Sequence, residues 1–157
     1  MHNSTASPAR PAAYRERLSP SLWALLSAAV AAPMVALVFV PLDSTVALLA
    51  GLGVAAALIV ALVAAAPVVS VRDGELRVGR AHIPVALLAD PIALTGDEAR
   101  QARGPGLPRD AWHLLRPGID GVVRVGVADD RDPASDWVFS TRTPDRVVAA
   151  IRRAQRS

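Results

Sequence analysis

The chain of 157 residues contains no cysteine and no lysine. The absence of cysteine excludes disulfide bridges, thiolate metal ligands and cysteine nucleophiles. All 17 basic residues are arginines, and the 14 acidic residues interspersed with them leave a formal net charge of +3. Because no basic run and no nucleic-acid-binding motif occurs, we expect no nucleic acid partner.

Charge is also missing from two long segments in the first half of the chain. No charged residue lies between Leu22 and Leu42, and none lies between Ser44 and Val71. A helix needs about 20 apolar residues to cross a bilayer, and neither segment has the polar face of a helix on a soluble protein. The sequence therefore predicts a transmembrane helical hairpin over residues 14–67, with helices at about 20–41 and 45–67.

Small residues recur at every fourth position of both segments. They are Ala24, Ala28, Ala32 and Ala36 in the first and Ala47, Gly51 and Ala55 in the second. This spacing lets transmembrane helices approach closely, although helices this rich in alanine also show it by chance. Close packing of the two helices is thus one interpretation of the pattern.

Arginines flank the predicted hairpin on both sides. They are Arg10, Arg15 and Arg17 before the first span and Arg72, Arg77 and Arg80 after the second. The connecting turn carries only Asp43. Since positively charged flanks stay in the cytoplasm, we expect a multi-pass protein of the cell membrane with both termini cytoplasmic. The spans lack ionisable side chains, which argues against a channel or carrier formed by this chain alone.

The remaining residues, 68–157, are predicted to form a small antiparallel β domain with a C-terminal helix at 144–155. Asp73-Gly74 between alternating residues indicates a hairpin, and further short strands follow. Thr143 is a good N-cap and Pro144 suits the first helical position. Residues 1–13 have no apolar pattern and are expected to be a disordered tail.

Taken together, these elements predict an α+β membrane protein. Its N-terminal two-helix hairpin precedes a domain of about seven strands and one helix. That order of elements is typical of pleckstrin-homology-like domains, although other small β domains share it.

Three arginines are the candidate site residues. Arg100, Arg103 and Arg109 surround the loop 104–108 and are a tentative contact for anionic lipid or a protein partner, because arginines near a membrane surface attract anionic headgroups. The alternative is a solvated or salt-bridged surface.

No catalytic, cofactor-binding or metal-binding residue is expected. His2, His82 and His113 have no metal-site spacing. The acidic run at 129–136 lacks the glycine and glutamate of a calcium loop. Ser140, Thr141 and Thr143 lack the glycines that surround a nucleophilic serine, which favours capping and turn roles.

Several motifs resemble those of a known family. They are Tyr14-Arg15-Glu16-Arg17-Leu18, Asp73-Gly74-Glu75-Leu76 with Gly79-Arg80, Arg103-Gly104-Pro105-Gly106, Leu115-Arg116-Pro117, and Trp137-Val138-Phe139-Ser140-Thr141-Arg142 with Pro144. Over roughly residues 14–153 the chain resembles DUF3093, an actinobacterial group of alanine-rich membrane proteins of unknown function. The resemblance implies two spans and a cytoplasmic domain in a bacterial cell membrane, and it supplies no catalytic residues.

The function expected from these features is that of a membrane-anchored cytoplasmic binding module. We expect the membrane bilayer as its integral partner, a protein or lipid ligand for the β domain, no cofactor and no enzymatic activity. The alternative is a small accessory or regulatory subunit of a larger membrane enzyme or transporter.

Overall fold

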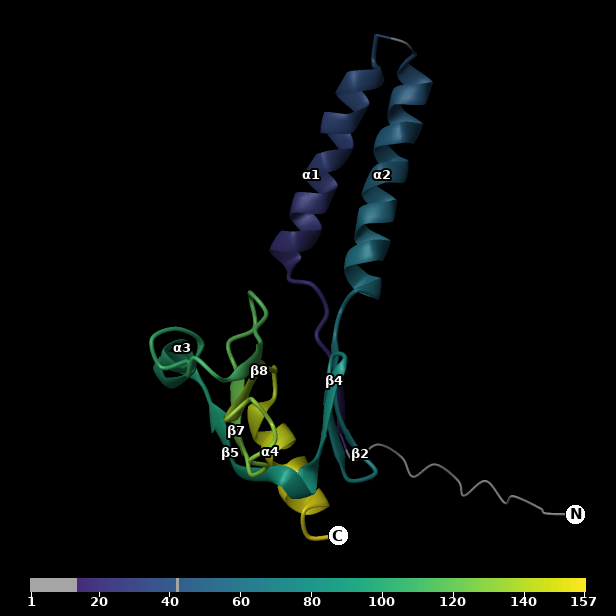
Figure 1. Ribbon diagram of the computed structural model, residues 1–157. Coiled ribbons are helices and arrows are strands. Elements are labelled where there is room, and N and C mark those ends of the chain that lie inside the picture. Colours follow the sequence, from purple (N-terminus) through teal and green to yellow (C-terminus); the bar gives the residue numbers. More distant parts are fainter. Residues whose placement is uncertain (1–13, 42) are drawn as a thin grey trace, which may run out of the picture. The chain divides into compact units, whose positions relative to one another are not determined.

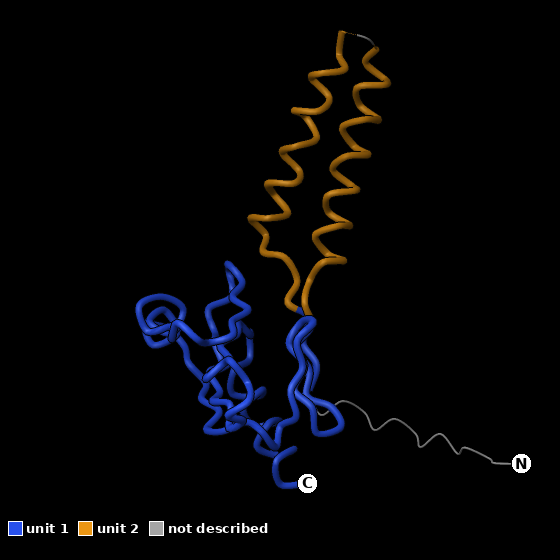
Figure 2. The backbone as a smooth tube through the Cα atoms, in the orientation of Figure 1, with its two compact units in different colours: residues 1–17, 68–157 blue, residues 18–67 orange. Residues whose placement is uncertain are grey.

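A computed structural model describes residues 14–41 and 43–157 (Figure 1). The disordered tail expected at 1–13 lies outside the described residues. The chain divides into two compact units (Figure 2). Residues 18–67 form one, and residues 14–17 together with 68–157 form the other.

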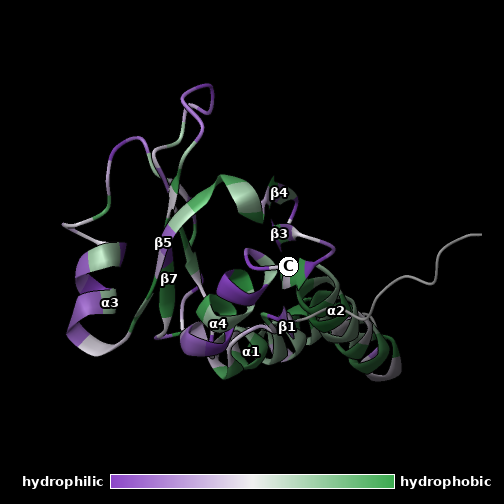
Figure 3. Cartoon of the chain, turned by 90° about the horizontal axis from the view of Figure 1, so that it is seen from below, coloured by the Kyte–Doolittle hydropathy of each residue, from purple (hydrophilic) through white to green (hydrophobic). Residues whose placement is uncertain are grey.

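The unit 18–67 is a pair of apolar helices, α1 (Leu22–Phe39) and α2 (Ser44–Ala64). Both are long and apolar enough to cross a membrane, and their ribbons carry mostly hydrophobic colouring in Figure 3. Helix α1 thus lies within the predicted 20–41, whereas α2 begins one residue before the predicted 45 and ends three residues before the predicted 67. An N-cap fixes where each helix begins. The Ser21 hydroxyl accepts from the Ala24 amide, and the Asp43 carboxylate accepts from the amides of Thr45 and Val46.

Small residues line the contact between α1 and α2. Ala28, Ala47 and Gly51 are buried, whereas the large apolar side chains of both helices are mostly exposed. A Cβ at Gly51 would lie 2.6 Å from the carbonyl oxygen of Ala32. The close-packing interpretation of the small-residue pattern is thus confirmed at these positions, and apolar side chains face outward around them.

The first sheet contains four antiparallel strands in the order β1-β2-β3-β4. They are β1 (Tyr14–Arg17), β2 (Val68–Arg72), β3 (Glu75–Val78) and β4 (Ala81–Pro84). Asp73 and Gly74 have positive φ angles of 50° and 76°, as a type I′ turn requires. The hairpin expected at Asp73-Gly74 is therefore confirmed.

Strand β1 corrects the predicted start of the helical hairpin at residue 14. Residues 14–17 belong to the β domain, where Tyr14 lies opposite Val71 and Arg17 opposite Val68. The physical reason is that these four residues pair with β2 in an antiparallel ladder, although residues 18–67 separate the two strands in sequence.

The second sheet has the strand order β5-β7-β8-β6. Its strands are β5 (Leu88–Leu94), β6 (Trp112–Leu114), β7 (Val122–Val127) and β8 (Asp136–Ser140), and a short 3-10 helix, η1 (Val85–Leu87), leads into β5. The pairs β5–β7 and β7–β8 are antiparallel, as expected. The pair β6–β8 is parallel, which departs from the fully antiparallel prediction. The rings of Trp112 and Trp137, which face each other across that pair, have centroids 4.3 Å apart.

Two helices complete the β domain. Helix α3 (Gly96–Arg103) contributes Ala99 and Ala102 to a small core with Val122 and Val138. Helix α4 (Pro144–Ala154) contacts β1 and β2 of the first sheet and β5 and β7 of the second. Its fully buried side chains include Val147 and Ile151, so the predicted amphipathic C-terminal helix joins the two sheets.

Candidate functional site

The outward side of the first sheet carries most of its charge. Along β2 and β3, Val69, Val71, Leu76 and Val78 are buried, so the alternate residues point to the other side. We call that side the basic face. It consists of Arg15, Arg17, Ser70, Arg72, Glu75, Arg77 and His82.

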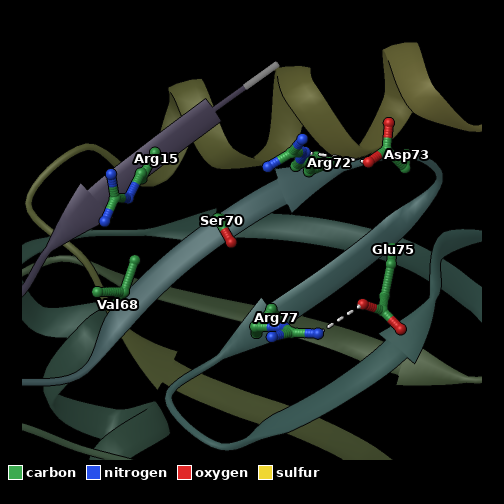
Figure 4. Close-up of a pocket in the computed structure, with 7 residues that line it drawn as sticks. All are labelled: Arg15, Val68, Ser70, Arg72, Asp73, Glu75 and Arg77. Carbon is green, nitrogen blue, oxygen red and sulfur yellow. Dashed lines mark hydrogen bonds and ion pairs between the residues drawn. The ribbon is translucent and has the colours of Figure 1, made fainter. Parts of the chain in front are cut away.

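One row of residues crosses the basic face from strand to strand. Arg15 lies opposite Ser70, and Ser70 lies opposite Arg77. Arg77 in turn lies opposite His82 on β4. Neighbouring strands are about 4.8 Å apart, so Arg15 and Arg77 leave the sheet about 10 Å apart with the Ser70 hydroxyl between them. Figure 4 shows Arg15, Ser70 and Arg77 among the side chains that line a hollow on the sheet.

Ion pairs on the basic face are exposed and local. Arg72 Nε lies 3.0 Å from the Asp73 carboxylate, and an Arg77 guanidinium nitrogen lies 3.3 Å from the Glu75 carboxylate. The Arg77 side chain nevertheless remains 57% exposed. Exposed ion pairs of this kind contribute about 1 kcal/mol or less to stability. The guanidinium groups can therefore readily leave these carboxylates and bind another anion. No ion pair or side-chain hydrogen bond joins Arg15 to another described residue.

A partly buried polar cluster lies on the opposite side of β1. The Glu16 carboxylate accepts hydrogen bonds from the hydroxyls of Tyr14 and Thr141 and from the backbone amide of Arg142. The Tyr14 hydroxyl also lies 2.7 Å from the Thr143 hydroxyl. These contacts fasten β1 to the turn between β8 and α4. They also explain why the Thr143 side chain makes no capping hydrogen bond, although Thr143 occupies the N-cap position as predicted.

The polar cluster changes the acidity of Tyr14. Burial, followed by the hydrogen bond to Glu16, raises the pKa of the Tyr14 phenol above its ordinary value of 10.0. Both effects disfavour the phenolate. The neutral phenol therefore acts as a hydrogen-bonding link in the fold, and no nucleophilic or basic role is indicated.

The three candidate arginines have different environments. Arg100 pairs with Asp97 on the exposed side of α3. Arg103 donates to the carbonyl oxygens of Ala99 and Ile119, at 3.2 and 2.8 Å, and so fastens the loop before β7 to the end of α3. Arg109 is exposed in the following loop. The Arg103 side chain thus has a structural role. Ligand binding by the three arginines stays a prediction.

The other polar residues singled out in the sequence have structural partners. The Ser140 hydroxyl accepts from the Arg116 amide at 3.0 Å, and Thr141 donates to Glu16. Arg124 forms two hydrogen bonds with Asp136, which raise the pKa of its guanidinium. Over residues 14–41 and 43–157, no group of three or more histidine, aspartate and glutamate side chains is placed to hold a metal ion.

Sequence reasoning missed the basic face and the Glu16 cluster for one shared reason. Both depend on β1, whose only local signal is the alternation in Tyr14-Arg15-Glu16-Arg17. By their position before the first apolar segment, Arg15 and Arg17 also fit the flank of a membrane span. A period-two pattern with the polar Tyr14 and Glu16 on one side and two arginines on the other is compatible with a strand, but it is too short to identify one by itself.

The fold defines a class of protein: an α+β domain whose first two strands are separated in sequence by an apolar helical hairpin. The family model described as "Protein of unknown function (DUF3093)" matches residues 13–151, and the chain belongs to that family. No curated protein and no solved structure matches the chain.

Proposed function

We propose that this protein is a membrane-anchored binding module without catalytic activity of its own. In this proposal α1 and α2 cross the cell membrane, and the β domain lies at the cytoplasmic surface, where it binds lipid or protein. The length and apolar surface of both helices support membrane insertion. The arginines that flank the hairpin support the cytoplasmic orientation.

One observation carries the proposal: β1 and β2 are hydrogen-bonded neighbours on the two sides of the hairpin. Arg17 ends β1 and lies opposite Val68, which begins β2. The chain therefore leaves the domain and returns to it at the same point. A segment that departs and returns in this way crosses a membrane an even number of times, which fits two helices joined by a short turn.

The domain fold supports a binding role. Two sheets followed by a helix that contacts both are compatible with a pleckstrin-homology-like arrangement, which we propose on the element order and these contacts. The inserted hairpin and helix α3 are additions to that arrangement. The parallel β6–β8 pair departs from it. A fold of this kind offers loops and sheet edges for binding and does not by itself specify a ligand.

Membrane fractionation followed by co-purification tests the proposal. The full chain is expected to stay in the membrane fraction after an alkaline carbonate wash and to enter solution only with detergent. Recovery in the washed-off soluble fraction would contradict membrane anchoring. Purification from mild detergent then distinguishes the alternative function, because a large partner recovered in fixed stoichiometry would identify an accessory subunit instead of a separate binding module.

A further inference from the structure

We infer that the basic face binds the headgroups of anionic phospholipids in the membrane that carries the hairpin. This inference rests on the proposed membrane anchoring and adds the chemistry of the ligand. The occupant is a phosphate-bearing lipid of that same membrane. Charge, geometry and chain connectivity each support the assignment.

Charge complementarity is the first argument. Arginines outnumber acidic residues on the basic face, where Glu75 is the acidic member and Asp73 lies in the adjoining turn. Guanidinium groups suit phosphate because they donate several hydrogen bonds in one plane. The ion pairs of Arg72 and Arg77 are exposed, and a phosphate can compete for their guanidinium groups at little cost.

The row across the sheet provides the geometry. Arg15 and Arg77 stand on either side of Ser70, one strand away from it in each direction. Long arginine side chains reach across a gap of about 10 Å, so both guanidinium groups can approach one phosphate above the Ser70 hydroxyl. These three residues line the hollow together with Val68 and neighbouring charged side chains (Figure 4).

Chain connectivity favours a membrane lipid over a free anion. The Arg15–Ser70 pair lies two residues along the ladder from the Arg17–Val68 pair, a distance of about 7 Å. At Arg17 and Val68 the chain passes into the links 18–21 and 65–67, which lead to α1 and α2. Links this short keep the row within reach of headgroups at the base of the proposed membrane helices.

The three arginines predicted from the sequence as ligand contacts, Arg100, Arg103 and Arg109, are less suited to bind one phosphate than the row across the sheet. Arg103 is committed to two backbone carbonyl oxygens, and Arg100 is paired within α3. Arg146 and Arg156 provide a matched control, since both are exposed and lie off the basic face, and replacing them removes the same charge.

The test measures which lipids the full chain retains in an uncharged mild detergent. Equal amounts of phosphatidylglycerol and phosphatidylcholine are added, and native mass spectrometry counts each bound lipid. We expect a preference for phosphatidylglycerol that weakens as salt rises. In the double variant Arg15→Gln with Arg77→Gln this preference should fall on the order of tenfold, whereas the double variant Arg146→Gln with Arg156→Gln should keep it. Unchanged circular dichroism establishes that each variant is folded.

Two results would overturn the inference. One is an equal preference for phosphatidylglycerol in the wild type and the Arg15/Arg77 double variant. The other is binding of soluble glycerol phosphate to the wild type as tightly as phosphatidylglycerol, which would mean a site for a free anion. Carbonate washing of the same proteins separates this question from the proposed function. A wild type without lipid preference that still resists the wash contradicts the lipid site alone, whereas a washed-off wild type contradicts the anchoring itself.

Discussion

Arg17 and Val68 lie directly opposite each other in the β1–β2 ladder, although the whole of residues 18–67 lies between them in sequence. The ladder continues one step further, because the Leu18 amide donates to the Pro67 carbonyl oxygen at 2.9 Å. The apolar hairpin thus occupies the place of an ordinary turn between two antiparallel strands.

Replacing residues 18–67 with a short loop rich in glycine and serine should give a soluble and folded domain. Such a loop is flexible enough to join two strand ends that lie opposite each other, and every contact between β1 and the rest of the domain is retained. Gel filtration and circular dichroism in the absence of detergent measure the outcome.

The control for this replacement is a chain that begins at Val68 and therefore lacks β1. It should unfold at a lower urea concentration and aggregate more readily, because it loses the Glu16 contacts and leaves the edge of β2 unpaired. Equal stability of the two proteins would show that β1 is not an integral part of the domain.

Gly51 and Gly53 should respond in opposite ways to alanine. A Cβ at Gly51 would meet the Ala32 carbonyl oxygen, whereas nothing lies within 4 Å of one at Gly53. Gly51→Ala should destabilise the helix pair by about 1–3 kcal/mol through overpacking. Gly53→Ala should be neutral or stabilise it by up to about 1 kcal/mol, because alanine favours a helix. Thermal denaturation of the full chain in mild detergent compares them, and a stable Gly51→Ala protein would be inconsistent with close helix packing.

The C-terminal helix provides a second matched pair. Ile151 is fully buried and Ala149 is exposed on the same helix. Ile151→Asp should cost on the order of 4 kcal/mol because it buries an unpaired carboxylate. Ala149→Asp should cost about 1 kcal/mol or less. Urea unfolding followed by tryptophan fluorescence measures both, and similar losses would refute the packing of α4 on the sheets.

Tyr14 should titrate above its ordinary pKa of 10.0 in the folded chain. It is the single tyrosine of the sequence, so tyrosinate absorbance reports on it alone. Because folding raises the pKa, the associated stability is fully present below pH 10 and is lost as the pH rises through the folded-state pKa. The variant Tyr14→Phe should lack this component of alkaline destabilisation.

Two further variants give opposite shifts of the Tyr14 pKa. Glu16→Gln removes a contact that raises it, whereas Thr143→Val removes a hydrogen bond that lowers it. We expect the Tyr14 pKa to fall in the first variant and to rise in the second. Titration of the wild type at the ordinary value would mean that the Glu16 cluster does not form.

Local patterns explain which parts of the fold are predictable from the sequence. The apolar helices, the turn at Asp73-Gly74 and the final helix each depend on signals within a few neighbouring residues. Strand β1 and the parallel β6–β8 pair depend on partners distant in sequence, and no local pattern specifies such partners. The basic face is not predictable from the sequence for the same reason as β1. Arg15 and Arg77 become neighbours of Ser70 only when the first sheet forms.

The most direct test of the account is the accessibility of two single cysteines in intact cells, because the chain has no cysteine of its own. Ser44 begins α2 at the turn of the hairpin, and Ser135 is exposed in the β domain before β8. Ser44→Cys should react with a membrane-impermeant maleimide in intact cells, and Ser135→Cys should react only after lysis. The reverse pattern would contradict the proposed orientation, and protection of both cysteines until lysis would contradict a hairpin that crosses the membrane.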